Sequence, residues 1–385
     1  MIVSSPASTI ALAPAREAPS IGVRGRRIPV VLPNRRDPRL KLSVVIMTLQ
    51  LLGQTVLDFK VSIAQILVTI AFSALVEMVI TFRREATLVW PASAMLTGSS
   101  VAFILRASGT AHGDWWSLNG IEFFLVAALL SLLSKYLIRP GGRHLFNPSN
   151  VGLVWILLVI GPRHVFPQYL WWGPSRVGQA LAYVVIFAGA WWILRRVRMV
   201  GMAVSFLATF AVLVGILAVG EREFVAIWHD GTISGLSYWA NIALSPELLI
   251  FVFFMVSDPQ TAPKTPLGRV IYGTATAALA AGLLSFQTTE FAIKVSILSS
   301  LTVVCALVPL IESVVRRLQA QPQPHPVAAL SSSLPRWRQV TAAARNPVIV
   351  AAVVITLAAP IDTAALAGDE EIMLIERGLA GKDAQ

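Results

Sequence analysis

The stretch RPGGRHLFNPSNVGLV, residues 139–154, introduces an apolar helix with glycines, a histidine and two asparagines around a proline. Apolar runs like the one that it opens recur between residues 42 and 311, and 56% of the 385 residues are hydrophobic while only 13% are charged. Runs of about 20 apolar residues are long enough to cross a bilayer, where backbone groups must bond within a helix. The sequence therefore predicts an all-α polytopic membrane protein.

The apolar runs predict about ten transmembrane helices, which divide into two five-helix halves of opposite orientation, an inverted repeat. The third run carries Pro91 and then LTGSS, residues 96–100, and the eighth runs SPELLIFVFFMVSDPQT, residues 245–261, so both are interrupted or end in polar residues. Interrupted helices at matching positions in two halves indicate a membrane binding site. The predicted spans are 42–57, 61–82, 86–105, 119–138, 147–161, 178–194, 202–219, 240–256, 270–286 and 293–311.

The distribution of lysine and arginine places the N-terminus in the cytoplasm, because cytoplasmic loops carry the excess of basic residues. The net charge of +11 is then explained by anionic lipid, and no nucleic-acid partner is expected. We predict a multi-pass protein of the cell inner (cytoplasmic) membrane, with the lipid bilayer as a partner. The basic residues predicted inside are the seven from Arg24 to Lys41, Arg83, Arg84, Arg139, Arg143, Arg195, Arg196, Arg198, Lys264, Arg269, Arg316 and Arg317, and those predicted outside are Lys60, Arg106, Arg163, Arg176, Arg222 and Lys294.

The chain divides into three regions. Residues 1–40 are predicted to be a basic disordered cytoplasmic arm without the features of a signal peptide, and residues 41–315 form the transmembrane domain. Residues 316–385 form a proline- and glutamine-rich linker and a tail. Within the tail, residues 347–368 are apolar but interrupted by a proline and an aspartate, so an eleventh span and an interfacial segment both stay open.

The polar start of the fifth span lies on the predicted cytoplasmic face. Asn147 is placed to cap the helix, with Pro148 at its first position. Ser149 and Asn150 lie in the first turn, where backbone N–H groups are free and carry a partial positive charge. Such a helix start can hold a phosphate, a carboxylate or the electron-rich edge of a ring. A well-capped helix start without any ligand is the alternative.

A second polar loop, SDPQTAPKTPLGR at residues 257–269, ends the eighth span on the same predicted face. Asp258 precedes a proline, so its backbone leaves the helical region. Thr261, Lys264 and Thr265 supply hydrogen-bond donors, and three prolines stiffen the loop. A charged turn that only sets the topology is the alternative. Because the two loops share a face and flank helices from opposite halves, we predict that they bind a planar, hydrogen-bonding ligand between them.

Several other kinds of site are not expected. Cys305 is the single cysteine, so neither an internal disulfide nor an iron–sulfur cluster is expected. No two histidines lie within the apolar spans, so a bis-histidine haem is not expected either, and no metal site or catalytic residue is assigned. Glu77 is an acid inside the second span. It either reaches toward Arg83 or Arg84 at its helix end or takes part in proton or ion movement.

The two loops resemble a known family. GGRHLFNPSNVGLV and FFMVSDPQTAPKTPLGRVIYG, with ALVPLIES at the end of the tenth span, are similar to the RnfD/NqrB family of membrane electron-transport subunits. The similarity covers residues 40–315, and within the family the chain resembles the enediyne-biosynthesis branch, whose members are called UnbU. The resemblance implies a ten-helix inverted repeat and a flavin near the cytoplasmic F-N-P motif, through which electrons pass within or across the membrane.

Carried over to this sequence, the resemblance makes Asn147 the first flavin contact. It adds His144, where some relatives have asparagine, and the second-loop residues Asp258, Thr261 and Thr265. Relatives attach FMN covalently to a threonine in an S/T-G-A-T motif after the fifth span. The corresponding loop here, GPRHVFPQYLWWGPSR, has no threonine. We therefore expect a noncovalent flavin, riboflavin or FMN, and no covalent FMN. The complete set of predicted cofactor contacts is His144, Asn147, Ser149, Asn150, Asp258, Thr261, Lys264 and Thr265.

The resemblance implies a subunit of a membrane oxidoreductase of the ion-translocating electron-transport type, with further membrane or cytoplasmic redox subunits as partners. The residues leave two other classes open. Inverted repeats with interrupted helices are also common in transporters, so a small-molecule transporter or exporter is one alternative. A non-redox membrane anchor of a biosynthetic complex is the other.

Overall fold

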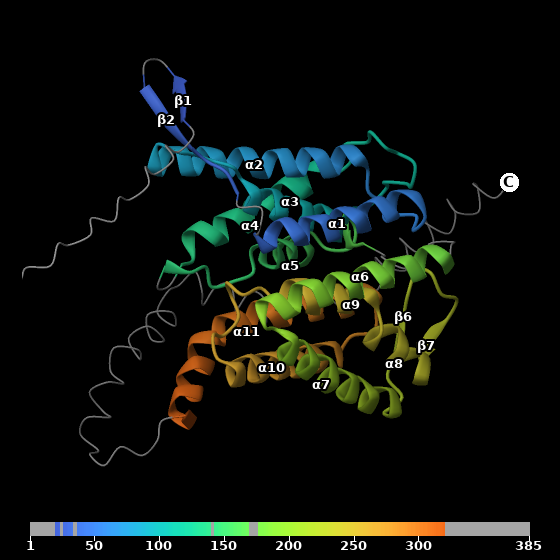
Figure 1. Cartoon of the computed structure of the whole chain (residues 1–385). Helices are drawn as coiled ribbons and strands as arrows, with labels where there is room; N and C mark the ends of the chain where they lie inside the picture. Colours follow the sequence, from blue (N-terminus) through green and yellow to red (C-terminus); the bar gives the residue numbers. More distant parts are fainter. Residues whose placement is uncertain (1–19, 24–25, 34–36, 140–141, 169–175, 320–385) are drawn as a thin grey trace, which may run out of the picture.

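The computed structural model describes residues 20–23, 26–33, 37–139, 142–168 and 176–319 (Figure 1). This part of the chain is mainly helical, and its helices lie in two layers in the view of Figure 1. The upper layer holds α1 (Pro38–Thr55), α2 (Ile63–Glu85), α3 (Ala92–Ile104), α4 (Ile121–Leu137) and α5 (Pro148–Ile160). The lower layer holds α6 (Arg176–Val197), α7 (Val200–Val219), α8 (Gly235–Ala243), α9 (Pro246–Ile250), the π-helix η2 (Phe251–Val256), α10 (Pro266–Leu284) and α11 (Glu290–Gln319).

Helices occupy all ten stretches that the sequence predicts to cross the membrane. Within the described residues, six helical segments are long and apolar enough to do so: Ile63–Glu85, Arg176–Val197, Val200–Val219, Gly235–Val256, Pro266–Leu284 and Glu290–Gln319. Two further apolar helices, Ala92–Ile104 and Pro148–Ile160, are shorter. The protein is thus a polytopic α-helical membrane protein, as predicted.

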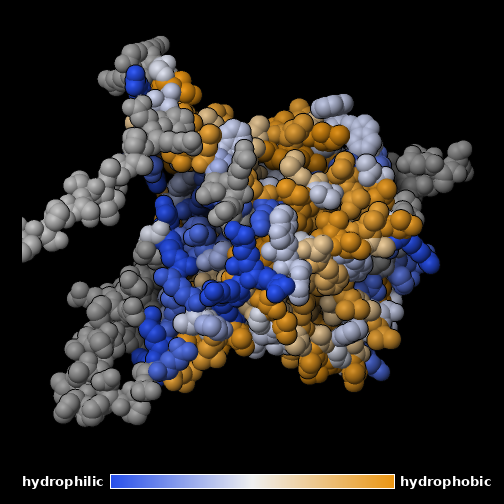
Figure 2. All heavy atoms as spheres, viewed as in Figure 1, coloured by the Kyte–Doolittle hydropathy of each residue, from blue (hydrophilic) through white to orange (hydrophobic). Residues whose placement is uncertain are grey.

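The outward faces of the helices are apolar. Val184, Phe187 and Trp191 of α6 are each more than half exposed, and apolar residues cover most of the right-hand part of the view in Figure 2. Such a continuous exposed apolar surface is suited to lipid rather than to water. By contrast, α11 is buried over most of its length, because it packs on α10 of its own layer and on α5 of the upper layer. The layers also meet where α1 packs on α6.

The eighth predicted span is interrupted. Its helix stops at Ala243, and Ser245 caps a new helix by accepting a hydrogen bond from Leu248 N at 3.2 Å. The chain then continues as the π-helix η2, all of whose residues are buried. π-Helical turns are rare and occur frequently at functional sites. Directly after η2 the chain enters the second polar loop.

Part of the predicted disordered arm forms strands. β1 (Ser20–Val23) pairs antiparallel with β2 (Arg26–Val31), and β2 pairs in parallel with β3 (Leu88–Val89), which follows α2. The arm is therefore ordered over these residues, because the β-branched run in β2 finds a partner that lies far away in the sequence. Two further strand pairs are antiparallel: β4 (Leu105–Ala107) with β5 (Val165–Pro167), and β6 (Glu223–Val225) with β7 (Thr232–Ser234).

At the other end of the domain, α11 continues to Gln319, beyond the predicted boundary at residue 315. Arg316 and Arg317 lie in its last turn, where cations favour the helix C-terminus. The first 19 residues, the predicted linker from residue 320 onward and the apolar segment 347–368 lie outside the described residues.

Candidate functional site

A cavity of about 880 Å³ opens between the two helix layers. Its wall combines both polar loops with the start of α3, the end of α4 and one side of η2, and the N-terminal residues Val31, Leu32 and Pro33 line it from the arm. Hydrophilic residues gather on this side of the molecule, at the left of Figure 2. The cavity is therefore the place where the sequence elements that we singled out come together.

The first loop is held by Asn147. Its Oδ1 accepts hydrogen bonds from Asn150 N at 3.2 Å and from Ser149 Oγ at 3.0 Å, and Pro148 is the first helical residue. The predicted N-cap is thus confirmed. The side-chain nitrogen of Asn147 donates to the carbonyl of Met255 at 3.2 Å, which ties the start of α5 to the end of η2. Asn147 is 7% exposed and lines the cavity while it makes these contacts.

The second loop is held by Asp258. Its Oδ1 accepts from Gln260 N at 2.9 Å, and its carbonyl accepts from the N–H groups of Thr261 and Ala262 at 3.2 and 3.0 Å. Thr265 caps α10 by accepting from Gly268 N at 3.1 Å. These bonds form a compact turn whose Asp258 and Gln260 line the cavity.

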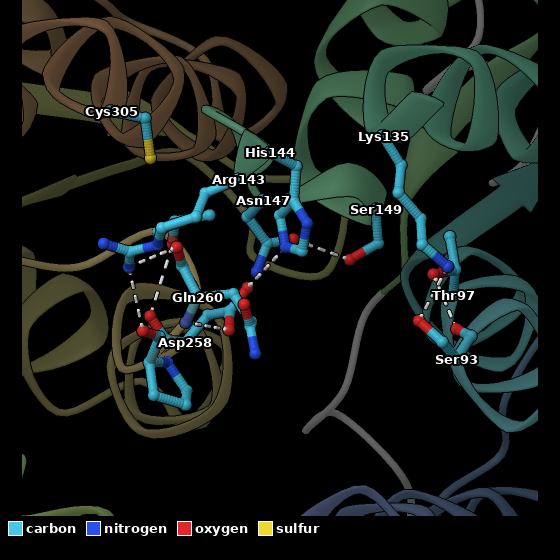
Figure 3. Close-up of polar contacts among 12 residues, drawn as sticks. Ser93, Thr97, Lys135, Arg143, His144, Asn147, Ser149, Asp258, Gln260 and Cys305 are labelled. Atoms are coloured by element: carbon cyan, nitrogen blue, oxygen red, sulfur yellow. Dashed lines mark hydrogen bonds and ion pairs between the residues drawn. The ribbon is translucent and has the colours of Figure 1, made fainter. Parts of the chain in front are cut away.

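The two loops contact each other directly (Figure 3). Arg143 donates from Nη2 to the carbonyl of Gln260 at 2.7 Å and to that of Pro259 at 3.3 Å. His144 Nε2 lies 3.9 Å from Asp258 Oδ2. Segments more than 100 residues apart in the sequence therefore meet at one edge of the cavity. This agrees with the prediction that both loops lie on the same face of the protein.

The predicted contact residues divide into two groups. His144, Asn147, Ser149 and Asp258 line the cavity. Asn150, Thr261, Lys264 and Thr265 do not: Thr265 is used as a helix cap, Thr261 Oγ1 donates to the carbonyl of Asp258 at 3.3 Å, and Lys264 is exposed. Asn150 points to α11, where its side-chain nitrogen donates to Leu298 O and Thr302 Oγ1, each at 2.9 Å.

Replacing Asn150 by alanine should therefore affect stability and not ligand binding. Asn150 is fully buried and links α5 to α11, and a hydrogen bond between membrane helices contributes on the order of 1 kcal/mol. We expect a lower temperature of thermal inactivation in detergent with an unchanged ligand affinity at the cavity. A loss of ligand affinity without a loss of stability would mean that Asn150 does contact the ligand.

A buried ion pair forms the far wall of the cavity, and sequence reasoning did not find it. Lys135 Nζ contacts Glu77 Oε1 and also donates to Ser93 Oγ at 2.9 Å. Glu77 further accepts from Tyr136 OH at 2.7 Å and from Ala94 N at 2.9 Å. Glu77 thus pairs with α4 and the start of α3 rather than reaching toward the arginines at the end of its own helix. The sequence does contain one indication of it. Lys135 lies one helical turn before Arg139, so the two side chains are expected on the same side of the helix, and both line the cavity.

Charges of both signs balance on the cavity wall. The cations are Arg39, Lys135 and Arg139, and the anions are Asp37, Glu77 and Asp258. Asp37 lies before α1, outside the membrane-spanning helices, and its side-chain hydrogen bond from Arg39 lowers the pKa of the Asp37 carboxyl. The wall is therefore suited to a ligand with polar edges and little net charge.

The comparison with protein families finds a similarity within the second layer. The model of the NQR2, RnfD, RnfE family matches residues 161–321. This part of the chain, the family region, is similar to the NQR2, RnfD, RnfE family. This family region contains α6 to α11 and the whole second loop. Residues 139–154 lie before the family region. The first loop contacts that region through the side chains of Arg143 and Asn147. No curated protein matches the chain, and placement in the enediyne-biosynthesis branch stays a prediction.

Proposed function

We propose that the chain is a membrane subunit of an RnfD/NqrB-like electron-transport system that holds a noncovalent flavin in the cavity between the two loops. The observation that carries the proposal is that the second loop, inside the NQR2, RnfD, RnfE family region, and the F-N-P loop outside it line the same cavity. Its volume of about 880 Å³ lies within the usual range of small-molecule sites.

The residues present fit a flavin. Asn147 has a second side-chain N–H besides the one that donates to Met255, and Asp258 Oδ2 and His144 provide acceptor and donor capacity at the loop junction. Phe253 and Phe254 of η2 also line the cavity and give it an apolar wall against which a ring can pack. Polar edges with an apolar face are what a tricyclic, hydrogen-bonding ring requires.

A bound flavin would supply the redox chemistry, and the protein would supply binding, orientation and electrostatics. In this proposal the loop junction orients the polar ring edge through Asn147, His144 and Asp258. The balanced wall charges keep the site near neutral, so that an uncharged ring is bound without a compensating ion. The Glu77–Lys135 pair fixes the far wall by tying α2, α3 and α4 together.

We further propose that the ten helical stretches are ten spans arranged as an inverted repeat with a cytoplasmic N-terminus. The packing pairs of the two layers correspond in support of this arrangement. In the first layer α2 packs on α3 and α4, and α4 packs on α5. In the second, α7 packs on α8 and α10, and α10 packs on α11. This arrangement would place the cavity on the cytoplasmic side of the inner membrane, where a redox partner could deliver electrons.

Purification of the full-length protein tests the cofactor. We expect visible flavin absorbance, and we expect denaturation to release all of the flavin, since the loop after α5 contains no threonine for covalent attachment. Chromatography of the released flavin then distinguishes riboflavin from FMN. A folded protein that contains no flavin and binds neither added compound would contradict the proposal. Substrate uptake or efflux by vesicles that contain such a protein would favour the transporter alternative.

A further inference from the structure

Three cations gather where the start of α1 meets the end of α6. Lys41 lies near the start of α1, and Arg195 and Arg196 lie in the last turn of α6. The two helices pack on each other and lie side by side in Figure 1. The ammonium group of Lys41 lies 4.4 Å from the centre of the Trp192 ring of α6, which brings the cations of both helices to one place. We call Lys41, Arg195 and Arg196 the basic patch.

The positive charge of the basic patch is not neutralised locally. Within the described residues, none of its three cations forms an ion pair with a carboxylate. Asp37, the carboxylate that precedes α1, is already paired with Arg39 at 2.7 Å. A helix C-terminus favours cations, which accounts for the two arginines of α6, but a helix N-terminus favours anions, and the first turn of α1 has no acidic residue. The start of α1 and the basic patch are therefore together suited to an anion.

Two tryptophans place the basic patch at the level of lipid headgroups. The guanidinium group of Arg195 lies 4.4 Å from the centre of the Trp191 ring, as Lys41 does from that of Trp192. Trp191 and Trp192 are 65% and 48% exposed. Exposed tryptophans of membrane proteins concentrate at the membrane–water interface, and lysines and arginines near helix ends extend their charged groups toward it. The basic patch therefore lies where the headgroup of a lipid ends and its acyl chains begin.

An exposed apolar stripe leads away from the basic patch along α6. Val184, Phe187 and Trp191 are spaced by three and four residues, so they lie on one face of the helix, and Arg195 continues that face by one more turn. All three apolar residues are more than half exposed. A comparable exposed stripe on α1 consists of Val44, Met47 and Leu51. In the view of Figure 2 the surface likewise changes from hydrophilic on the left to apolar on the right. A cationic end followed by an apolar stripe matches the phosphate and the acyl chains of a phospholipid.

The basic patch is separate from the two-loop cavity. Leu42, Ile193 and Val197, which belong to the same two helices, line that cavity, whereas no residue of the basic patch does. An acidic cytoplasmic protein is another anion that the cations would attract, but such a protein would not cover the apolar stripe of α6, which is suited to lipid. The stripe therefore favours a phospholipid over a protein as the partner.

We propose that the basic patch and the stripe of α6 bind one anionic phospholipid, with its phosphate between Lys41, Arg195 and Arg196 and an acyl chain along Phe187 and Val184. A zwitterionic phospholipid has the same phosphate and chains, but it also carries an ammonium group that the three cations repel. The bound lipid contacts α1 of the upper layer and α6 of the lower layer, so it joins the two layers. This inference does not depend on the flavin proposal.

Native mass spectrometry of the delipidated full-length protein, titrated with lipid in detergent, tests the site. We expect one dioleoylphosphatidylglycerol to bind more tightly than dioleoylphosphatidylcholine, which has the same acyl chains. Lys41→Gln/Arg195→Gln should weaken the binding of phosphatidylglycerol about 25-fold, about fivefold for each cation, and should leave that of phosphatidylcholine unchanged. Arg83→Gln/Lys264→Gln is the matched control. It removes two exposed cations from the same predicted face but outside the basic patch, and it should leave both affinities unchanged.

Three results would overturn the inference. Equal affinity of the wild type for the two lipids would leave the basic patch to an acidic partner protein. An equal loss of phosphatidylglycerol binding in the patch variant and in the control would assign the effect to overall charge. Displacement of bound phosphatidylglycerol by inorganic phosphate at the same concentration would assign the patch to a free anion. If the double variant does not fold, Lys41→Gln and Arg195→Gln make the same test singly, each with an expected loss of about fivefold.

Discussion

Replacing Lys135 by methionine is expected to destabilise the protein by about 3–5 kcal/mol, because it leaves the carboxylate of Glu77 buried without its cation. Glu77 is 6% exposed, and its bonds from Tyr136 OH and Ala94 N do not replace a full positive charge. The pair also joins α2 to α4 at the wall of the two-loop cavity. The fraction of folded protein after heating in detergent, measured by size-exclusion chromatography, should fall sharply at temperatures that the wild type survives.

The double variant Glu77→Gln/Lys135→Met should recover most of this loss, since no unpaired charge then stays buried. Lys264→Met is the matched control, because it removes an exposed lysine near the same cavity. If Lys135→Met were no less stable than Lys264→Met, or if the double variant were the least stable of the three, the ion pair would not stabilise the fold as its burial indicates.

Gly152→Val is the second substitution with a large expected effect. A Cβ atom at Gly152 would overlap the side-chain oxygen of Ser131 and the carbonyl of Ala127, and would lie 3.0 Å from Ser131 N. The backbone of α4 cannot move aside as the end of a flexible side chain can, so the two helices must separate. Overpacking of this kind costs about 1–3 kcal/mol or more. Because α5 carries Asn147, we expect loss of both thermal stability and cavity binding.

Gly282→Val is the matched control for this prediction. Gly282 lies in a membrane helix as Gly152 does, but a Cβ at Gly282 meets nothing within 4 Å. Thermal inactivation of the two variants in the same detergent makes the comparison. Equal thermal stability of the two variants would show that the fold does not require close packing of α4 on α5.

Much of the helical layout could be predicted from the sequence, because a run of apolar residues is enough to identify a membrane helix. The cap at Asn147 is equally local, since it depends on an Asn-Pro pair at the start of an apolar run. The shared face of the two loops followed from the distribution of basic residues. By contrast, the pairing of β2 with β3 joins Val30 to Leu88, and no local pattern specifies such a partner.

For the candidate site too, the sequence predicts which types of residue are present but not where their side chains point. The sequence indicates that Thr261, Thr265 and Asn150 are hydrogen-bonding residues, but it does not indicate which groups they contact. In the structure all three bond to neighbouring turns or helices instead of lining the cavity. Lys135 was missed for the opposite reason: it lies in an apolar run, and its partner Glu77 is 58 residues away.

The affinity of the purified full-length protein for riboflavin and FMN, measured by quenching of flavin fluorescence, tests most directly whether the two loops form one flavin site. His144→Phe in the first loop and Asp258→Asn in the second should each weaken binding about tenfold, the effect of losing one charge-assisted hydrogen bond. Lys264→Ala, in the second loop but outside the cavity, should leave it unchanged. Equal affinity in all three variants, or a loss confined to Lys264→Ala, would contradict the account.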